Sequence, residues 1–366
     1  MDNDGHFMKM ALALAKRGEG LTSPNPLVGT VLVKNGRVLS KGYHKRAGSH
    51  HAEIIALNKA GKKAMGSTLY VTLEPCVHHG KTPPCVDRII KEGVKRVVIG
   101  ARDPNPINNG RGMKRLRREG VDVVCGVLRS EAERLNRAFN VYITKKRPYV
   151  SIKAAQSLDG KIATFSGNSK WITNRLSRNF AHNLRGRVDA VLVGVNTVIK
   201  DDPRLSARAG NPKKQPIKIV LDSRLRAPLT RRLFKNGKKD VIVAATVRAP
   251  KERVERFRRA GIEVVLFKED RGVVDIRALL RYLAKRGISH LLVEGGGSVI
   301  ASFIDKALAD EVFIFISPRI IGGRDATTSV EGRGAGSLGE AVRLKFVEVK
   351  KLNGDILIHA DVYRNN

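Results

Sequence analysis

Three side chains that commonly ligate metals, His51, Cys76 and Cys85, occur with the carboxylate Glu53 in the first quarter of the chain. One imidazole and two thiolates give zinc three protein ligands, and catalytic zinc sites keep the fourth position for water. Zinc lowers the pKa of that water and so provides a nucleophile at neutral pH. Because Glu53 follows His51 by two residues, it can lie beside the metal without ligating it and carry a proton. The pattern predicts one hydrolytic zinc site per chain, with Glu53 as a catalytic residue.

The order of these residues is typical of zinc deaminases, in which His-x-Glu precedes Pro-Cys-x-x-Cys and a ring carbon is attacked. Here eight residues rather than two separate the cysteines. Both thiols can still reach one metal if residues 77–84 form a loop and Cys85 enters the next helix. Two alternatives remain open. One is a metal-free arrangement with buried cysteines, and the other is a structural zinc whose fourth ligand is His50, His78 or His79.

Length and composition bound the other possibilities. The 366 residues predict two domains. The net charge of +35 is spread over both halves and favours polyanions, but only 5% of residues are aromatic and no basic-aromatic interleaving occurs. We therefore expect phosphate-bearing small molecules and no specific nucleic-acid partner. The chain shows no leader-like N-terminus and no long apolar run, so we expect a cytoplasmic protein without membrane segments. Cys125 is expected to be a buried strand residue.

Alternating helix and strand patterns predict a three-layer α/β domain in the first part. Asn35-Gly36 between two apolar runs predicts a hairpin over residues 27–43. Ser130 to Glu133 has the spacing of a capping box and predicts a helix continuing to about Tyr142. The further elements expected are helices over 6–17, 51–60, 83–93 and 112–119, and strands over 69–73, 94–99 and 121–124. The pattern breaks at residues 144–148, which sets domain bounds of 1–145 and 148–366.

The second part predicts another α/β domain with an antiparallel finish. Residues 345–363 indicate two strands around Asn353-Gly354. Further strands are expected over 149–154, 190–194, 217–222, 241–245, 263–267, 290–293 and 311–317. The segment Glu294-Gly-Gly-Gly-Ser298 follows one strand and opens a helix, where backbone amides attract phosphate. It lacks the Gly-x-Gly-x-x-Gly pattern, which argues against a Rossmann fold.

Several longer motifs occur in one order along the chain. They are Pro24-Asn-Pro-Leu-Val-Gly29, His51-Ala-Glu53, Thr72-Leu-Glu-Pro-Cys76, His79-Gly-Lys-Thr-Pro-Pro-Cys85, Asp103-Pro-Asn-Pro106, Lys153-Ala-Ala-Gln-Ser-Leu-Asp-Gly160, Asp201-Asp-Pro-Arg-Leu205 and Val293-Glu-Gly-Gly-Gly297. Together they resemble the bifunctional deaminase/reductase family of riboflavin biosynthesis over nearly the whole chain. The eight-residue cysteine spacer matches this family. The resemblance implies a cytidine-deaminase-like α/β/α domain followed by a dihydrofolate-reductase-like α/β domain.

The resemblance also implies two reactions. Zinc-dependent hydrolysis removes the 2-amino group of a phosphoribosylaminopyrimidine, and NADPH then reduces the ribosyl group to ribityl phosphate. It places zinc on His51, Cys76 and Cys85. It assigns the pyrimidine and its phosphoribosyl arm to Asn25, His44, His78, Lys81, Asp103 and Asn105. It further suggests a homo-oligomer, a dimer or tetramer, that associates through the reductase half.

In the second half, the resemblance assigns the cofactor to Ala155, Trp171, Thr197, Asp201 and the Gly295, Gly296, Gly297, Ser298 loop. It assigns the reductase substrate to Ser169 on the nicotinamide side and to Arg185, Leu205, Arg208, Ser223 and Glu294. Lys153 and Asp201 are alternative catalytic residues that polarise the sugar carbonyl or relay a proton. Two other functions remain as alternatives. They are a lone deaminase of cytidine, a deoxynucleotide or tRNA, and a zinc-stabilised nucleic-acid-binding protein.

Overall fold

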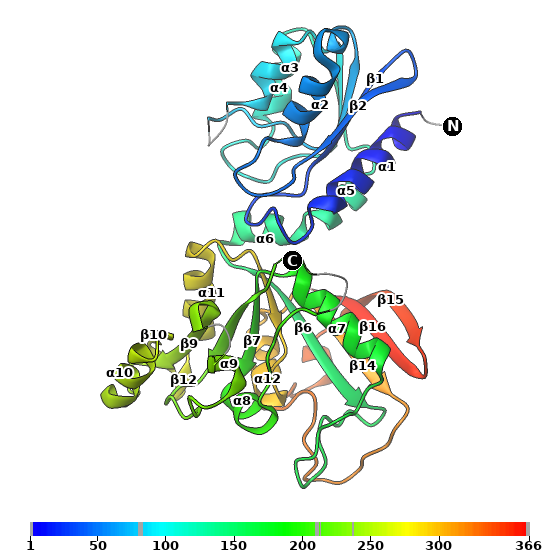
Figure 1. The fold of residues 1–366 in the computed structure, drawn as a ribbon. Coiled ribbons are helices and arrows are strands. Elements are labelled where there is room, and N and C mark those ends of the chain that lie inside the picture. Colours follow the sequence, from blue (N-terminus) through cyan, green and yellow to red (C-terminus); the bar gives the residue numbers. More distant parts are fainter. Residues whose placement is uncertain (1–2, 80–82, 209–211, 213, 236–237, 364–366) are drawn as a thin grey trace. The chain divides into compact units, whose positions relative to one another are not determined.

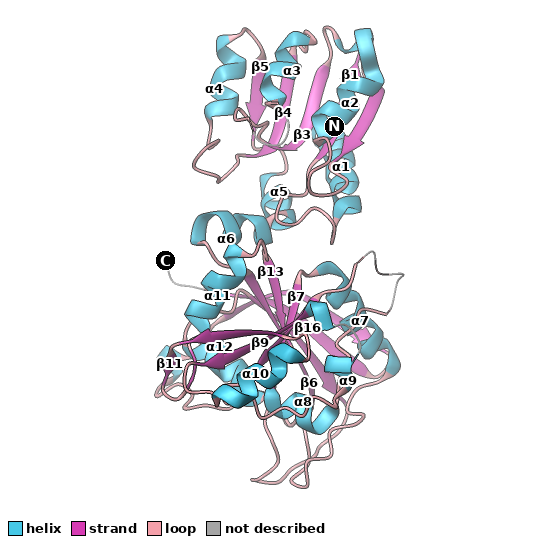
Figure 2. Ribbon diagram, turned by 60° about the vertical axis from the view of Figure 1, so that its left-hand side comes forward, coloured by secondary structure: helices cyan, strands magenta, loops and turns pink. Residues whose placement is uncertain are grey.

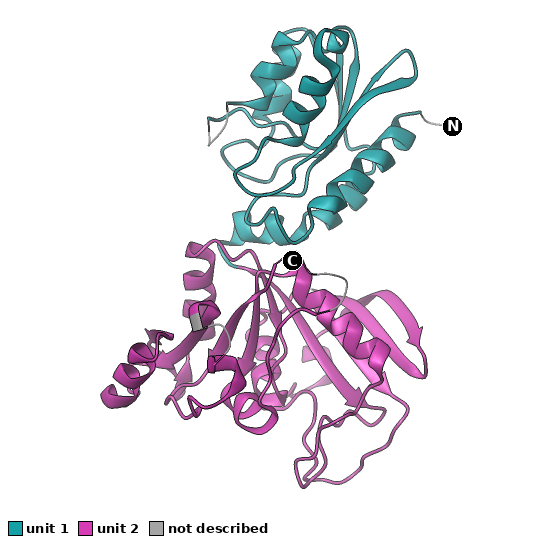
Figure 3. Ribbon diagram, in the orientation of Figure 1, with its two compact units in different colours: residues 1–147 teal, residues 148–366 magenta. Residues whose placement is uncertain are grey.

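The structure is a computed structural model that describes the chain except residues 1–2, 80–82, 209–211, 213, 236–237 and 364–366. The chain divides into two compact units, Met1–Arg147 and Pro148–Asn366 (Figure 3). Each unit is an α/β structure built around its own sheet (Figure 1). The mixed α/β fold expected from the sequence is confirmed for both.

The first unit contains a five-stranded sheet in the order β2-β1-β3-β4-β5. β1 pairs antiparallel with both neighbours, whereas β3, β4 and β5 are parallel. Asn35 and Gly36 have positive φ values of 51° and 72°, as the expected hairpin turn requires. The strands are β1 (Gly29–Lys34), β2 (Arg37–Tyr43), β3 (Thr68–Leu73), β4 (Arg96–Ala101) and β5 (Asp122–Cys125).

Helices cover both faces of this sheet (Figure 2). Alternate strand residues face opposite layers, so Val31 and Tyr70 pack toward α1 and α5 while Leu32 and Val71 pack toward α2, α3 and α4. A Cβ on Gly42 would lie 2.2 Å from the Ala52 carbonyl oxygen, so the absence of a side chain there lets α2 approach β2 closely. The helices are α1 (Asn3–Ala15), α2 (Ala52–Ala60), α3 (Cys85–Lys91), α4 (Arg111–Arg118), α5 (Arg129–Leu135) and α6 (Arg137–Lys145).

Two expectations for the end of this unit were wrong. The capping box does not form, because α5 begins at Arg129, before Ser130, and is preceded by Leu128 with φ 54°. Helical structure does continue past Tyr142, but as two helices, α5 and α6, that are separated at Asn136. The buried Asn136 side chain accepts from the Leu27 N–H at 2.7 Å and donates to the Leu27 carbonyl at 2.9 Å. Cys125 does end a strand, the edge strand β5, but it is exposed rather than buried.

The second unit contains a nine-stranded sheet in the order β10-β9-β8-β7-β13-β6-β14-β16-β15. The first seven strands in this order are parallel and the last two pair antiparallel, as the sequence predicts. They are β6 (Tyr149–Ser157), β7 (Ala190–Gly194), β8 (Ile217–Leu221), β9 (Val241–Thr246), β10 (Glu263–Phe267), β13 (His290–Val293), β14 (Glu311–Ser317), β15 (Leu344–Leu352) and β16 (Asp355–Val362). A separate two-stranded ribbon joins β11 (Glu269–Asp270) and β12 (Val273–Val274).

Helices also cover both faces of the second sheet. One apolar layer includes side chains of α7, α9 and α10, and the other includes α11 and α12. The short α8 follows β7 directly. The bounds are α7 (Arg175–Arg187), α8 (Val195–Asp201), α9 (Arg232–Lys235), α10 (Lys251–Arg259), α11 (Ile276–Lys285) and α12 (Gly297–Asp305).

Two loops of the second unit join to form a feature that we call the strap, residues 158–169 and 318–331. The Ile162 N–H donates to the Thr327 carbonyl at 2.8 Å, and the Ser329 N–H donates to the Gly160 carbonyl at 3.0 Å. Asp159 accepts from the backbone N–H groups of Ile321 and Gly322. These bonds hold together the segments that follow β6 and β14.

Candidate functional sites

The ends of three elements bring the expected zinc ligands together. His51 lies immediately before α2, Cys76 follows β3, and Cys85 begins α3. The His51 Nδ1 atom lies 3.2 Å from the Cys85 Sγ and 3.6 Å from the Cys76 Sγ. All three donor atoms lie within 4.8 Å of one another. The long cysteine spacer therefore does not separate the thiols.

This donor set fits zinc. With Zn–N near 2.05 Å and Zn–S near 2.3 Å, tetrahedral geometry places a nitrogen and a sulfur donor about 3.5 Å apart. The two N–S distances in the structure are close to this value. Hydrogen bonds from Cys85 and His51 also lower the pKa of the Cys76 thiol to about 4, against the effect of burial. The cysteine is thus held in the form that ligates metal.

Glu53 lies in the first turn of α2, next to this cluster. The residue is 4% exposed, and burial raises the pKa of its carboxyl group. Its Oε2 atom has no hydrogen-bond partner among the described residues. Burying a carboxylate oxygen without a hydrogen-bond donor is costly. This oxygen is therefore one that a hydrogen-bond donor on a ligand would satisfy.

Several residues expected at the pyrimidine surround the same cluster. Asn25 Nδ2 lies 3.2 Å from His44 Nε2, and the buried His44 ring contacts the His51 ring edge-on at 5.6 Å. His78 also has a buried Nδ1 atom without a partner among the described residues. Asp103 is buried and accepts from the Asn105 N–H at 2.9 Å. Lys81, which was expected at the phosphoribosyl arm, lies outside the described residues.

Two buried residues that the sequence analysis did not select hold this region in place. The Glu74 carboxylate accepts from backbone N–H groups of Asp103, Gly110, Gly112 and Met113, at 2.9–3.3 Å. Asn108 accepts from the Val77 N–H at 3.1 Å and donates to Asp103 Oδ2 at 3.1 Å. Together they tie the segment of Cys76 to the loop of Asp103. Glu74 stood inside a quoted motif, whereas nothing in the sequence around Asn108 indicated this role.

The second unit holds a cavity of about 480 Å³ between the strap, α8 and the start of α12. Its lining contains many of the residues expected to contact cofactor or substrate. Ser169 donates to Asp201 Oδ1 at 3.0 Å, which connects the strap to the end of α8. The expected residues that line the cavity are Ser169, Thr197, Asp201, Ser223, Gly296, Gly297 and Ser298.

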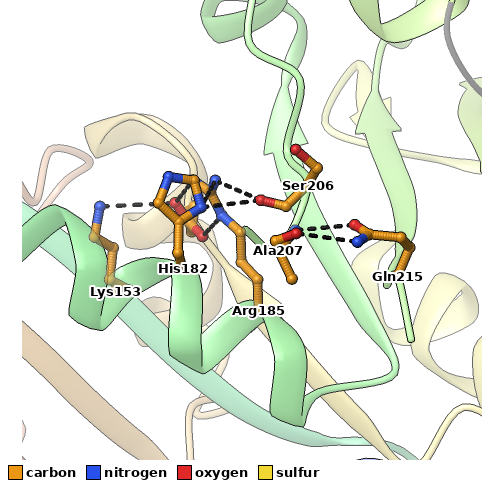
Figure 4. A network of polar contacts seen from close by, with 7 residues as sticks. Lys153, His182, Arg185, Ser206, Ala207 and Gln215 are labelled. Atoms are coloured by element: carbon orange, nitrogen blue, oxygen red, sulfur yellow. Dashed lines mark hydrogen bonds and ion pairs between the residues drawn. The ribbon is translucent and has the colours of Figure 1, made fainter. Parts of the chain in front are cut away.

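A second group of expected residues forms a buried polar network (Figure 4). Arg185 donates to both Glu294 oxygens, at 2.6 and 2.7 Å, and Lys153 Nζ lies 3.6 Å from Glu294 Oε2. Burial opposes ionisation of Glu294, but the charges of Arg185 and Lys153 outweigh it and lower the carboxyl pKa to about 2. Burial also lowers the pKa of Lys153. The Ser206 carbonyl, 3.4 Å from Arg185 Nη1 and 3.0 Å from His182 Nδ1, closes the network.

Five other expected residues lie outside both groups. Trp171 is 63% exposed, so it does not fill the core, and the Arg178 guanidinium lies 4.5 Å from its ring. A Cβ on Gly295 would overlap Val299, so this glycine serves helix packing. The remaining three are Ala155, which packs on an apolar layer; Leu205, which is buried there; and Arg208, which is exposed.

Comparisons with known proteins agree with this division. Residues 1–101 match the model of the cytidine and deoxycytidylate deaminase zinc-binding region, and residues 148–358 match that of the RibD C-terminal domain. The riboflavin biosynthesis protein RibD of Aquifex aeolicus is 44% identical over 97% of each chain, and that of Escherichia coli is 39% identical over 97% of this chain and 98% of its own.

Solved structures give the same result. RibD of Acinetobacter baumannii has a TM-score of 0.89 with 35% identity, covering 99% of each chain. A diaminohydroxyphosphoribosylaminopyrimidine deaminase/5-amino-6-(5-phosphoribosylamino)uracil reductase of Thermotoga maritima has a TM-score of 0.86 with 40% identity, again covering 99% of each. Across the described part of the chain, every helix is too short or too polar to cross a membrane.

A zinc-binding deaminase domain joined to a reductase domain defines the class of this protein as a two-activity enzyme. The chain belongs to the RibD family, the bifunctional deaminase/reductases of riboflavin biosynthesis. This result overturns the alternatives of a lone deaminase and of a zinc-stabilised nucleic-acid-binding protein.

Proposed function

We propose that the deaminase domain, residues 1–145, hydrolyses the 2-amino group of 2,5-diamino-6-(5-phosphoribosylamino)pyrimidin-4(3H)-one. The reductase domain, residues 148–366, then uses NADPH to reduce the ribosyl group to ribityl phosphate. The observation that carries the proposal is the buried, unpartnered Glu53 oxygen beside the His51, Cys76 and Cys85 donors. A purely structural zinc site has no use for such a carboxylate.

His51, Cys76 and Cys85 would hold one zinc ion per chain. When bound, zinc supplies the Lewis acid that makes water nucleophilic at neutral pH. Glu53 accepts the proton that water loses when its oxygen bonds to the ring carbon. Glu53 then returns that proton to the departing nitrogen, and the second proton of the water moves from the new hydroxyl to the adjacent ring nitrogen, so that water and the amine yield a carbonyl and ammonia. Asn25 and His44 would contact the ring; this is supported by the His44 ring, which lies against His51 and within 3.2 Å of Asn25 Nδ2.

In the reductase domain, the cavity would hold NADPH, which supplies the hydride. The α12 N-terminus lines this cavity, and backbone amides there favour phosphate. Arg185, Glu294 and Lys153 would bind the substrate's sugar-phosphate arm. We favour Lys153 over Asp201 as the proton carrier, because burial lowers the pKa of its ammonium group and so favours release of the proton. Asp201 instead accepts a hydrogen bond from Ser169.

The proposal extends to assembly and location. We infer a homo-oligomer that associates through the reductase domain. Phe346 and Val349 are 66% and 63% exposed on the edge strand β15, and exposed apolar edges favour pairing with another chain. We further propose a cytoplasmic enzyme whose partners are small phosphoribosyl pyrimidines.

The decisive test combines two variants. Glu53→Gln should retain zinc but lose deamination by at least about 10²-fold, because the proton carrier is removed while the ligands stay. Glu133→Gln, an equal charge change at an exposed ion pair on α5, should leave ammonia release unchanged. Ammonia and NADPH oxidation are followed together with the diaminopyrimidinone substrate. Full turnover by Glu53→Gln would disprove the assignment, and ammonia release without NADPH oxidation would disprove the reductase half.

A further inference from the structure

The carboxylate of Glu331 lies against the start of α12, at one end of the reductase cavity. Its Oε2 accepts from the Ser298 hydroxyl at 2.5 Å, and its backbone N–H donates to the Gly297 carbonyl at 3.3 Å. Glu331 and Thr327 of the strap line the cavity together with Gly296, Gly297 and Ser298. The strap thus places an anion at the helix end where an anionic cofactor group is expected.

The glycines of this segment serve different purposes. A Cβ on Gly296 would meet nothing within 4 Å among the described residues, so this position opens toward the cavity. A Cβ on Gly297 would lie 2.5 Å from the Thr328 carbonyl oxygen and 2.6 Å from the Glu331 Cγ. The strap therefore leaves no room for a side chain at position 297. The strap and a bound phosphate would compete for the same helix terminus.

Charge makes this placement significant. The cavity lining contains three cationic side chains, Lys200, Arg224 and Arg226, which suit a phosphorylated ligand. Glu331 is an acid at the helix N-terminus, where the macrodipole stabilises negative charge. The Glu331 carboxylate accepts from the Ser298 hydroxyl rather than from the backbone N–H groups of the helix end, and its charge repels a phosphate that approaches those N–H groups.

We propose that Glu331 lies where a cofactor phosphate approaches the α12 N-terminus and that cofactor binding displaces it. Glu331 is then a residue that sets cofactor affinity. The inference rests on the proposed use of NADPH by this cavity. Displacement exchanges the Ser298–Glu331 hydrogen bond for contacts with the cofactor, so part of the binding free energy is spent on moving the strap.

The test is a fluorescence titration of the full-length chain with NADPH. Glu331→Gln should lower the Kd about five- to tenfold, because it removes a like charge and keeps an oxygen that can accept from Ser298. Glu340→Gln is the matched control, since Glu340 accepts from the Gly336 N–H and does not line the cavity. Dihydronicotinamide riboside, which has no phosphate, should bind with the same Kd to the unaltered chain and to both variants.

A second measurement needs no variant. NADPH should increase hydrogen exchange in the peptide covering residues 327–333 of the unaltered chain, because its contacts with α12 are broken. An unchanged Kd in Glu331→Gln, a weakened one, or unchanged exchange on NADPH binding would overturn the inference. If NADPH fails to bind the unaltered chain at all, the proposed reductase function fails instead, so the two failures are distinguishable.

Discussion

Replacing Arg185 with Met should destabilise the second unit strongly. The Arg185 and Glu294 side chains are only 14% and 7% exposed, and two short hydrogen bonds join them. Removing one partner of a buried ion pair leaves the other charge uncompensated, which costs about 3–5 kcal/mol. Lys153, at 3.6 Å from Glu294, offsets part of this cost and favours the lower end of the range.

Urea unfolding followed by tryptophan fluorescence measures the loss of stability in the second unit. Trp171 is the only tryptophan and belongs to the second unit, so its fluorescence follows that unit alone. A loss of about 3 kcal/mol lowers the unfolding midpoint by about 1–2 M urea. Arg286→Gln is the control. Arg286 and Glu263 form a pair with side chains 44% and 39% exposed, and such pairs contribute at most about 1 kcal/mol.

The pH dependence gives a sharper result. Glu294 has a pKa of about 2 in the folded chain against an ordinary value of 4.5. Its ionised form therefore contributes stability that is complete above about pH 4.5 and is lost as the pH falls toward 2. Protonated Glu294 needs no cation, so the deficit of Arg185→Met should shrink below pH 4.5. Adding Glu294→Gln to Arg185→Met should recover much of the loss at pH 7. A deficit below about 1 kcal/mol at pH 7, or one that grows in acid, would refute the reasoning.

Three further predictions concern activity. Cys76→Ser should lose bound zinc in metal analysis, while Cys125→Ser should keep it, because Cys76, unlike Cys125, belongs to the donor cluster; equal zinc in both would contradict the site. Asn108→Ala should keep zinc but lower deaminase kcat/KM about 10- to 100-fold, since it positions the loop of Asp103; unchanged kinetics would remove that role. As a proton donor, Lys153 should make the reductase kcat fall as pH rises through its lowered pKa. Glu294→Gln should move that fall to lower pH, because the Glu294 charge raises the Lys153 pKa; a profile unmoved by Lys153→Met would favour Asp201.

The sequence predicted both sheets and the zinc cluster because their signals are local. Strand bounds follow from short apolar runs, and the hairpin turn at Asn35-Gly36 requires positive φ, which those two residues adopt readily. The three expected zinc donors could be selected because their residue types and order form a recognisable motif, and the structure brings their donor atoms together. The eight-residue spacer was compatible with one site, since α3 begins at Cys85 itself.

The features that escaped prediction depend on contacts between distant segments. Asn136, which separates α5 from α6, bonds through its side chain to the backbone of Leu27, more than one hundred positions earlier. Cys125 is exposed at the end of the edge strand β5, and strand periodicity does not reveal which strand lies at the edge of a sheet. Asn108 likewise acts through Val77, 31 positions away. Local patterns contain no information on any of these partners.

Each unit has a buried glutamate directly after a sheet strand, but different groups satisfy the two carboxylates. Glu74 and Glu294 each follow a parallel strand directly, β3 in one unit and β13 in the other, and both carboxylates are buried beside the site residues. Carboxyl ends of parallel strands are where α/β folds bind ligands. Backbone N–H groups satisfy Glu74, so its role is to hold loops in place. Side-chain cations satisfy Glu294, and a substrate phosphate can compete for those cations. This difference is consistent with the proposed roles, a fixed frame for the zinc ligands beside Glu74 and a substrate site beside Glu294.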